Sequence, residues 1–300
     1  MPDKQHAILS ASSSYRWLAC PPSALECAKR PDTTSDFARE GTDAHTLCEY
    51  KVKEALAGRP RTTGTLDYYS EEMAECTDDY AQFVMERLAE AKKECKDPIV
   101  LVEQRLDFSK WVPDGFGTGD CVIVADDTLT VIDYKHGLGV EVSAEKNPQM
   151  MCYALGALDL FDGIYDIQRV SMTIFQPRRD NVSTYEMTKG DLLQWAEKVL
   201  KPTAALAAKG EGEYKAGEHC RFCKIRATCR KRAEYNLELA RYDFAMPSTL
   251  RDAEVEAVLE KADDLVAWWV TLRTMPCSRL YPARHGLAGN WWKGAPIAVM

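Results

Sequence analysis

The sequence predicts an α/β chain with a small mixed central sheet flanked by helices. Three observations predict it: helical apolar periodicity in the first third, a β-branched hairpin after Gly119, and a helix that interrupts the later strands. Of the 300 residues, 46% are hydrophobic and 28% are charged. This ordinary globular composition excludes a disordered, collagen-like or coiled-coil chain, and the length allows one large domain or two small ones.

Helices are predicted at the N-terminal side of the chain and again between and after the strands. Ser70 is expected to cap a helix, because its hydroxyl can accept a free backbone N–H at the helix start. Gly58 is expected to end the helix before it, and the Pro21-Pro22 pair follows the first helix. The predicted helices cover 14–19, 36–57, a stretch from Ser70 to Ala91, 148–160, 191–208 and 253–269.

The strand pattern predicts a small sheet. Asp126-Asp127 provides a turn between two apolar, β-branched runs, which predicts a hairpin. The predicted strands cover 99–108, 120–125, 129–134, 169–175 and 182–187.

Charge and hydropathy exclude several classes of protein. A net charge of −8 and a pI of about 5.3 exclude a protein that coats nucleic acid by bulk positive charge. A cation-dependent nucleic-acid enzyme stays compatible, because its site needs carboxylates. The uncharged apolar runs are far shorter than the roughly 20 residues of a membrane span, and the first six residues lack a signal-peptide apolar region. We therefore expect a cytoplasmic protein without a membrane partner, whose eleven cysteines are thiols or metal or cluster ligands rather than disulfides.

The most informative pattern is a pair of carboxylates and a lysine on the predicted hairpin. Five acid-x-Lys triplets occur in the chain, but only Asp133-x-Lys135 ends a run of apolar strand residues. Because side chains alternate along a strand, Asp133 and Lys135 point to the same face. Asp120, at the start of the partner strand, is expected to lie beside them. Such a group is costly without a bound cation, and the alternative is a surface hairpin whose end carries a salt bridge.

These groups suit metal-dependent hydrolysis of a phosphodiester. The carboxylates of Asp120 and Asp133 and the backbone carbonyl of Tyr134 are hard oxygen ligands that suit Mg²⁺ or Mn²⁺. A cation bound there would polarise the phosphate and lower the pKa of a water molecule. Lys135 is suited to orient that water or to neutralise the charge that develops on the phosphate.

Two neighbouring motifs make the sequence resemble the RecB-like exonuclease branch of the PD-(D/E)XK nuclease superfamily. In that branch a helix with Gln-x-x-x-Tyr follows the acid-x-Lys strand, as Gln149 and Tyr153 do here, and i, i+4 spacing puts both on one helix face. Gly41 to His45 is similar to the branch's Gly-x-x-x-His helix motif. The resemblance implies a restriction-endonuclease-like core in which His45 is a metal ligand. It also implies that Gln149 contacts the water or the DNA phosphate and that Tyr153 supports the site.

Two further acids are candidates for this site. Glu49 lies one turn beyond His45 on the same helix face, where it is a ligand, a supporting group or a surface charge. Glu103 lies on the predicted strand before the hairpin, and it either faces the site or forms a salt bridge near Arg105.

Cys220, Cys223 and Cys229 have the spacing Cys-x₂-Cys-x₅-Cys, which predicts a metal or cluster site. Tetrahedral zinc and a cubane iron–sulfur cluster both need four ligands, so one more cysteine is required. The spacing is similar to that of iron–sulfur RecB-like nucleases, including AddB-type subunits. The resemblance implies a 4Fe–4S cluster whose fourth ligand is an N-terminal Cys followed by Pro, here Cys20, and which staples the two ends of the nuclease core. Structural zinc is the alternative metal, and Cys27 is a competing fourth ligand.

Basic residues gather around these cysteines. Residues 219–232 hold six Lys or Arg and no acid, which makes contact with a DNA backbone an expectation. A solvated helix face would have the same composition. The expected DNA-binding residues are Arg221, Lys224, Arg226 and Arg230.

Three segments are predicted along the chain. A nuclease core covers 1–235 and is closed by the N- and C-terminal cysteines, an amphipathic helix covers 236–272, and a tail without assigned function covers 273–300. The apolar stripe expected on the amphipathic helix consists of Val255, Val258, Leu259, Ala262, Leu265, Val266 and Trp269.

A second resemblance concerns biological context. Residues 12–24 and Gln176-Pro177-Arg178 resemble a phage and prophage family that carries an uncharacterised-domain label. Together the resemblances imply a metal-dependent DNA exonuclease of phage replication or recombination in the bacterial cytoplasm. DNA and a phage single-strand-binding or annealing protein would be its partners. The alternative is a catalytically idle DNA-binding or scaffold module of the same fold; a redox enzyme is disfavoured because the chain lacks a Gly-rich cofactor loop.

Overall fold

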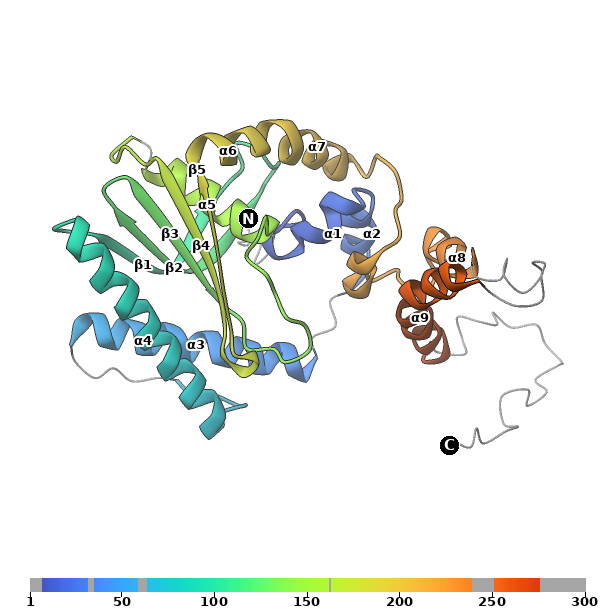
Figure 1. Cartoon of the computed structure of the whole chain (residues 1–300), viewed down its shortest axis with the longest axis horizontal. Coiled ribbons are helices and arrows are strands. Elements are labelled where there is room, and N and C mark those ends of the chain that lie inside the picture. The colour runs from blue at the N-terminus through green and yellow to red at the C-terminus, as the bar shows by residue number, and fades with distance from the viewer. Residues whose placement is uncertain (1–6, 32–34, 59–63, 162, 239–250, 276–300) are drawn as a thin grey trace. The chain divides into compact units, whose positions relative to one another are not determined.

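The structure is a computed structural model that describes residues 7–31, 35–58, 64–161, 163–238 and 251–275. The chain divides into two compact units, a first unit of residues 1–224 and a second unit of residues 225–300 (Figure 1). This division falls between Cys223 and Cys229, inside the segment 1–235 that the sequence predicts as the core.

A five-stranded mixed sheet forms the centre of the first unit, in the order β1-β2-β3-β4-β5 (Figure 1). Its strands are β1 (Ile99–Asp107), β2 (Phe116–Ala125), β3 (Thr128–Tyr134), β4 (Arg169–Gln176) and β5 (Asn181–Thr188). Only β3 and β4 pair in parallel; the other neighbours are antiparallel. A parallel pair needs a long crossover, which here contains α5 (Pro148–Phe161). The α/β class, the mixed sheet and the flanking helices are therefore confirmed.

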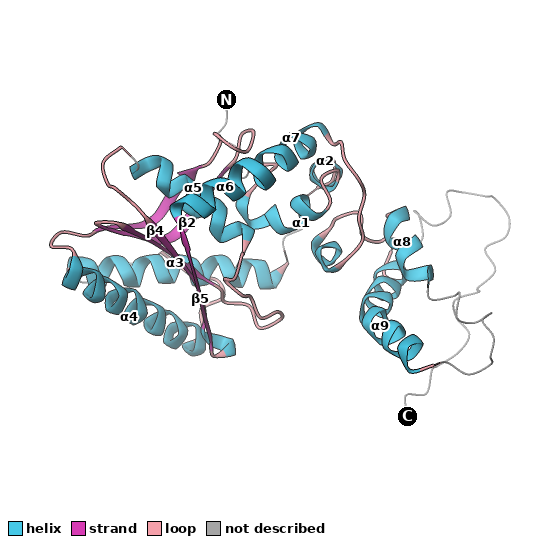
Figure 2. Ribbon diagram, turned by 45° about the horizontal axis from the view of Figure 1, so that its top comes forward, coloured by secondary structure: helices cyan, strands magenta, loops and turns pink. Residues whose placement is uncertain are grey.

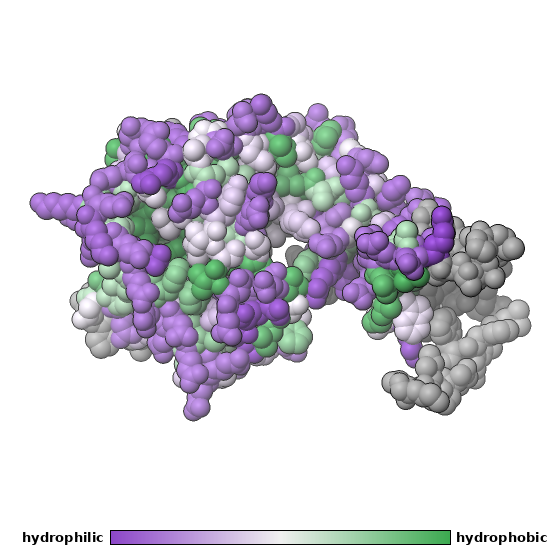
Figure 3. All heavy atoms as spheres, in the orientation of Figure 1, coloured by the Kyte–Doolittle hydropathy of each residue, from purple (hydrophilic) through white to green (hydrophobic). Residues whose placement is uncertain are grey.

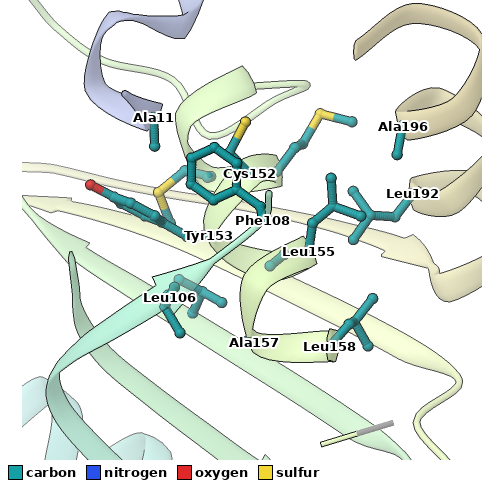
Figure 4. Packing of buried hydrophobic residues seen from close by; sticks show 14 of the residues in the cluster. Ala11, Leu106, Phe108, Cys152, Tyr153, Leu155, Ala157, Leu158, Leu192 and Ala196 are labelled. Carbon is teal, nitrogen blue, oxygen red and sulfur yellow. The ribbon is translucent and has the colours of Figure 1, made fainter. Parts of the chain in front are cut away.

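Helices cover both faces of the sheet (Figure 2). On one face, Val122 and Val131 pack with α5 and with η1 (Ala11–Ser13) and α1 (Ser14–Ala19). Figure 4 shows this core, with Leu155 and Leu158 of α5 above the strands. On the other face, the alternate strand residues Cys121 and Ile132 pack against α3 (Asp36–Ala57) and α4 (Glu71–Glu94). The outer surface of the first unit is mostly hydrophilic on the side drawn in Figure 3.

Local capping explains where the long helices begin and end. The Ser35 hydroxyl accepts the N–H of Ala38 at the start of α3, and Gly58 ends that helix with a left-handed φ of 60°. The Ser70 hydroxyl accepts the N–H of Met73 at the start of α4, as predicted.

Two parts of the first unit differ from the sequence prediction. A short helix, α2 (Ser23–Ala28), follows Pro21-Pro22, where only a break was expected. The single helix predicted over 191–208 is three segments: α6 (Lys189–Trp195), a π-helical segment η3 (Ala196–Leu200) and α7 (Lys201–Lys209). The reason is Pro202, which has no backbone N–H to continue an α-helical ladder into the preceding turn. A short helix, η4 (Glu218–Phe222), follows α7.

The second unit contains α8 (Arg230–Leu237) and α9 (Asp252–Arg273). The predicted apolar stripe of α9 holds only in part: Val258, Ala262 and Leu265 are half-buried, whereas Val255, Leu259, Val266 and Trp269 are exposed. The buried face also carries Asp264, which forms an ion pair with the buried Arg232, and Trp268. An ion pair with one buried partner and the buried Trp268 ring therefore lie on the side of α9 that contacts α8. The predicted tail lies outside the described residues from 276 onward. No described helix combines the length and the apolar character needed to cross a membrane.

Candidate active site

Three carboxylates occupy one row across β1, β2 and β3. Val102 pairs with Cys121 and Gln104 with Gly119, so the register places Glu103 opposite Asp120. The register of β2 and β3 continues from Cys121 and Ile132 to Asp120 and Asp133. The β1–β2 ladder skips Glu103 and Asp120, the β2–β3 ladder ends at Cys121 and Ile132, and Glu103 has a left-handed φ of 54°. This conformation is strained for a residue with a side chain.

Asp120 lies at the centre of the row and is 8% exposed. Its Oδ2 accepts the backbone N–H of Tyr134 at 2.7 Å, so the carboxylate takes the place of a backbone partner from β2. Its Oδ1 lies 3.1 Å from Nδ1 of His45, a residue of α3. The Tyr134 ring stands edge-on to the His45 ring, with 5.7 Å between centroids.

The charges of His45 and Asp120 support each other. Burial alone would lower the pKa of His45, but the Asp120 carboxylate outweighs burial and raises this pKa to about 9. Burial alone would raise the pKa of Asp120, but His45, the Tyr134 N–H and Lys135 outweigh it and lower this pKa. The pair therefore holds a carboxylate in ionised form at a buried position.

Asp133, Lys135 and Gln149 form a second group beside the first. Asp133 is 2% exposed, and its Oδ2 lies 2.8 Å from Nζ of Lys135. Gln149 donates from Nε2 to Asp133 Oδ1 at 3.2 Å and accepts from Lys135 Nζ at 3.2 Å. Gln149 Nε2 also donates to the hydroxyl of Tyr153 at 3.1 Å, so the i, i+4 pair lies on one face of α5. Burial opposes the charge of Lys135, but Asp133 outweighs it and raises the pKa of this lysine, which stays an ammonium.

The donor set fits a hard divalent cation. The ligand atoms of His45, Glu103 and Asp120 all lie within 4.8 Å of one another. Within the described part of the chain, the buried Oδ2 of Asp133 makes no hydrogen bond and has only its ion pair with Lys135. Burial raises the pKa of Glu103 to about 7, and the charge of Asp120 adds to this effect. A cation bound between these ligand atoms would relieve the repulsion between Glu103 and Asp120, because it would add positive charge next to both carboxylates.

The structure separates the two extra acids that the sequence suggested. Glu103 lies with His45 and Asp120, whereas Glu49 forms an ion pair with Lys53 of α3. Glu49 is half-buried and its charge contributes to the raised pKa of Glu103, so a ligand, a supporting group and a surface charge all stay open for it.

A network behind His45 was missed by sequence reasoning. The hydroxyl of Tyr134 lies 2.8 Å from Nδ1 of the buried His136, and Nε2 of His136 lies 3.4 Å from Glu40 of α3. Arg178 joins Glu40 to Glu72 of α4. The network fastens α3 and α4 to the end of β3, and thus holds His45 over Asp120. Arg178 stood in a motif that the sequence had singled out, but its partners are more than a hundred residues away.

The N-terminal and C-terminal cysteines of the first unit approach each other. The sulfurs of Cys27 and Cys223 are 3.8 Å apart, and the backbone N–H of Lys224 donates to the Cys27 sulfur at 3.3 Å. The hydrogen bond with Cys223 lowers the pKa of Cys27 although burial opposes it. Cys20 is also buried, seven residues before Cys27 in the sequence. The contact with Cys223 keeps Cys27 as a candidate partner of this segment beside Cys20. Cys229 belongs to the second unit.

The predicted DNA-binding residues fall in both units. Arg221 and Lys224 belong to the first unit, where Lys224 donates to the backbone carbonyl of Arg30. Arg226 and Arg230 belong to the second unit. The structure therefore divides this basic segment after Lys224.

The fold and the site define a mixed α/β protein with a candidate centre for a hard divalent cation at the sheet edge. The chain belongs to the family described as "Protein of unknown function (DUF2800)", whose family model matches residues 6–293. Among solved structures, the chain is similar to the one described as "Crystal structure of SSO0001". The two are 12% identical, the match covers 62% of this chain and 95% of that chain, and the TM-score is 0.24. A likeness at this level supports no functional argument.

Proposed function

We propose that this chain is a Mg²⁺- or Mn²⁺-dependent deoxyribonuclease, acting as an exonuclease, on a restriction-endonuclease-like core. The observation that carries the proposal is the meeting of two groups on the neighbouring strands β2 and β3: His45 with Asp120, and Asp133 with Lys135 and Gln149. They come from α3, β2, β3 and α5, as the resemblance to RecB-like nucleases implies. A salt bridge on a surface hairpin would not need a third and a fourth element.

The residues have distinct roles in the proposed reaction. His45, Asp120, Asp133 and the Tyr134 carbonyl would hold the cation, with Glu103 as a further ligand. A bound Mg²⁺ or Mn²⁺ supplies Lewis acidity and makes a water molecule a better nucleophile. Lys135 carries a fixed positive charge toward the phosphate, where negative charge grows in the transition state.

Gln149 and Tyr153 hold Asp133 and Lys135 in position. Gln149 contacts both Asp133 and Lys135, so it fixes the distance between the carboxylate and the ammonium. Burial raises the pKa of Tyr153, and its hydroxyl stays protonated to accept from Gln149.

Degradation of DNA tests the proposal. Purified protein with Mg²⁺ or Mn²⁺ is expected to release acid-soluble nucleotides from linear duplex DNA and to spare covalently closed circles. Chelation of the metal should stop the release. Binding of DNA without cleavage in either metal would contradict the proposal and support the idle DNA-binding or scaffold module. The proposed setting, phage or prophage replication or recombination with an annealing or single-strand-binding partner, rests on the sequence resemblance alone.

Replacement of His45 by alanine is expected to lower cleavage in Mg²⁺ by roughly 10-fold, with partial recovery in Mn²⁺. The imidazole is one ligand among several, and Mn²⁺ accepts a looser set of ligands than Mg²⁺. The measurement is the cleavage rate in each metal. Thr46→Ala is the matched control, because Thr46 follows His45 on α3, is exposed, and donates its hydroxyl to the carbonyl of Thr42 within the same helix. A loss in Thr46→Ala equal to that in His45→Ala would contradict the assignment.

We also propose that the cysteines bind a metal centre that fastens the N-terminal helices to the segment after α7. The 4Fe–4S cluster and structural zinc both remain candidates, with ligands from Cys20, Cys220, Cys223 and Cys229. The contact of Cys27 with Cys223 adds Cys27 to this set. The 3.8 Å contact between the Cys27 and Cys223 sulfurs supports a shared site for these two cysteines. The Cys-x₂-Cys-x₅-Cys spacing supports the cluster, and structural zinc is the alternative.

A further inference from the structure

The loop after Lys135 presents apolar side chains to solvent. Leu138, which follows Gly137, is 48% exposed, and Val140, which follows Gly139, is 42% exposed. Single exposed apolar residues are common on protein surfaces. These two are close together, and only two residues separate Lys135 from Leu138.

Side chains hold the backbone of this loop in place. Gln176, which is 1% exposed, donates to the carbonyls of Gly137 and Val140 at 2.6 and 2.8 Å. Arg179 donates to the carbonyl of Leu138 at 2.6 Å. The exposed side chains therefore project from an anchored backbone rather than from one held only by its ends. A mobile loop would lose conformational entropy when it binds a ligand, whereas a loop whose backbone is already held loses little more.

A cation and an exposed aromatic ring lie next to the loop. A Cβ atom built on Gly139 would lie 4.0 Å from Nη2 of Arg221. The guanidinium of Arg221 lies 5.8 Å from the centre of the Phe222 ring, and Phe222 is 70% exposed. The buried cysteines on either side, Cys220 and Cys223, fix the backbone that carries them.

We propose that Phe222, Arg221, Leu138 and Val140 form a binding platform for unpaired nucleotides of a DNA strand beside the active site. Sequence-tolerant binding of single strands combines aromatic rings, on which bases stack, with cations that neutralise the phosphates. Phe222 supplies the stacking surface, Arg221 the charge, and Leu138 and Val140 apolar contact with the next base. The proposal extends the proposed nuclease function and names the substrate form, a strand end that is single-stranded.

The occupant follows from the chemistry of the surface. A duplex exposes phosphates and groove edges but no base faces, so it would leave Phe222, Leu138 and Val140 against solvent. Only a strand with unstacked bases uses the aromatic, apolar and cationic groups together.

The test of the platform is the affinity for a short fluorescent single-stranded oligonucleotide. It is measured by fluorescence anisotropy, with Ca²⁺ in place of Mg²⁺ or Mn²⁺. Phe222→Ala is expected to weaken this binding by about 5- to 100-fold, as loss of a stacking ring does. The double variant Leu138→Ser with Val140→Ser is expected to weaken it by about 3-fold or more, and both variants should bind a blunt duplex of the same sequence nearly as the unchanged protein does. Tyr69→Ala and Ile164→Ala are matched controls, because both residues are exposed and lie elsewhere in the first unit.

Two further measurements distinguish loss of the aromatic ring from damage to the cysteine segment that carries it. The metal content of Phe222→Ala shows whether the cysteine segment is intact, and Phe222→Tyr, which keeps a ring, should restore single-strand binding. Unchanged single-strand affinity in both Phe222→Ala and the double variant would overturn the platform. An equal loss for single strand and duplex would also overturn it. Failure of the nuclease proposal appears differently, as absence of cleavage in the unchanged protein.

Discussion

Asp133→Ala and Lys135→Ala are each expected to lower DNA cleavage by about 100-fold or more while most DNA binding remains. Asp133 contributes a buried oxygen without a hydrogen bond, and Lys135 contributes the positive charge next to it. Both groups act more strongly on the transition state than on bound DNA, so their loss should appear in the cleavage rate. Asp120→Ala should behave in the same way, because Asp120 connects His45 to the row of carboxylates.

The comparison needs controls for folding and for charge. Asp133→Asn keeps the shape of the side chain, and its thermal melting should show whether a loss of activity is a loss of fold. Glu90→Ala and Lys92→Ala alter another acid-x-Lys triplet of the same chain, on the exposed side of α4. They should leave cleavage unchanged. Turnover like that of the unchanged protein in Asp133→Ala or Lys135→Ala would refute the active-site assignment.

Cys27→Ala and Cys223→Ala are expected to lose the bound metal and to melt at a temperature lower by about 5 °C or more. A metal that binds only the folded chain stabilises it, and a missing ligand removes that stabilisation. The sequence spacing predicts the same result for Cys220→Ala and Cys229→Ala. A cubane cluster should give brown protein with about four irons per chain, and zinc should give colourless protein with one metal ion.

Comparison of Cys20→Ala with Cys27→Ala identifies the N-terminal ligand. The Cys-Pro pattern predicts that Cys20→Ala loses the metal, whereas the sulfur contact predicts this for Cys27→Ala. Cys95→Ala is the control, since Cys95 is buried at the end of α4, away from this segment in the chain. Metal content and melting temperature that are unchanged in Cys27→Ala would show that the contact with Cys223 is only packing.

The sequence by itself determined the features that depend on near neighbours. The bounds of α1 and α3 agree with the prediction, because caps and breaking residues act within one or two turns. The closeness of Asp120 to Asp133 followed from the hairpin register, and the common face of Gln149 and Tyr153 followed from helical spacing.

Tertiary structure alone decided which distant groups meet. The position of Glu103 depends on a left-handed backbone that no local pattern signals. His45 reaches Asp120 because the apolar face of α3 packs on the sheet and because Glu40, His136 and Arg178 connect the helix to it. The buried face of α9 also carries Asp264, which pairs with Arg232, and Trp268, neither of which belongs to the predicted apolar stripe. Periodicity shows which residues share a face. Which face is buried, and which cysteine or carboxylate finds a partner, depends on how elements far apart in the chain pack together.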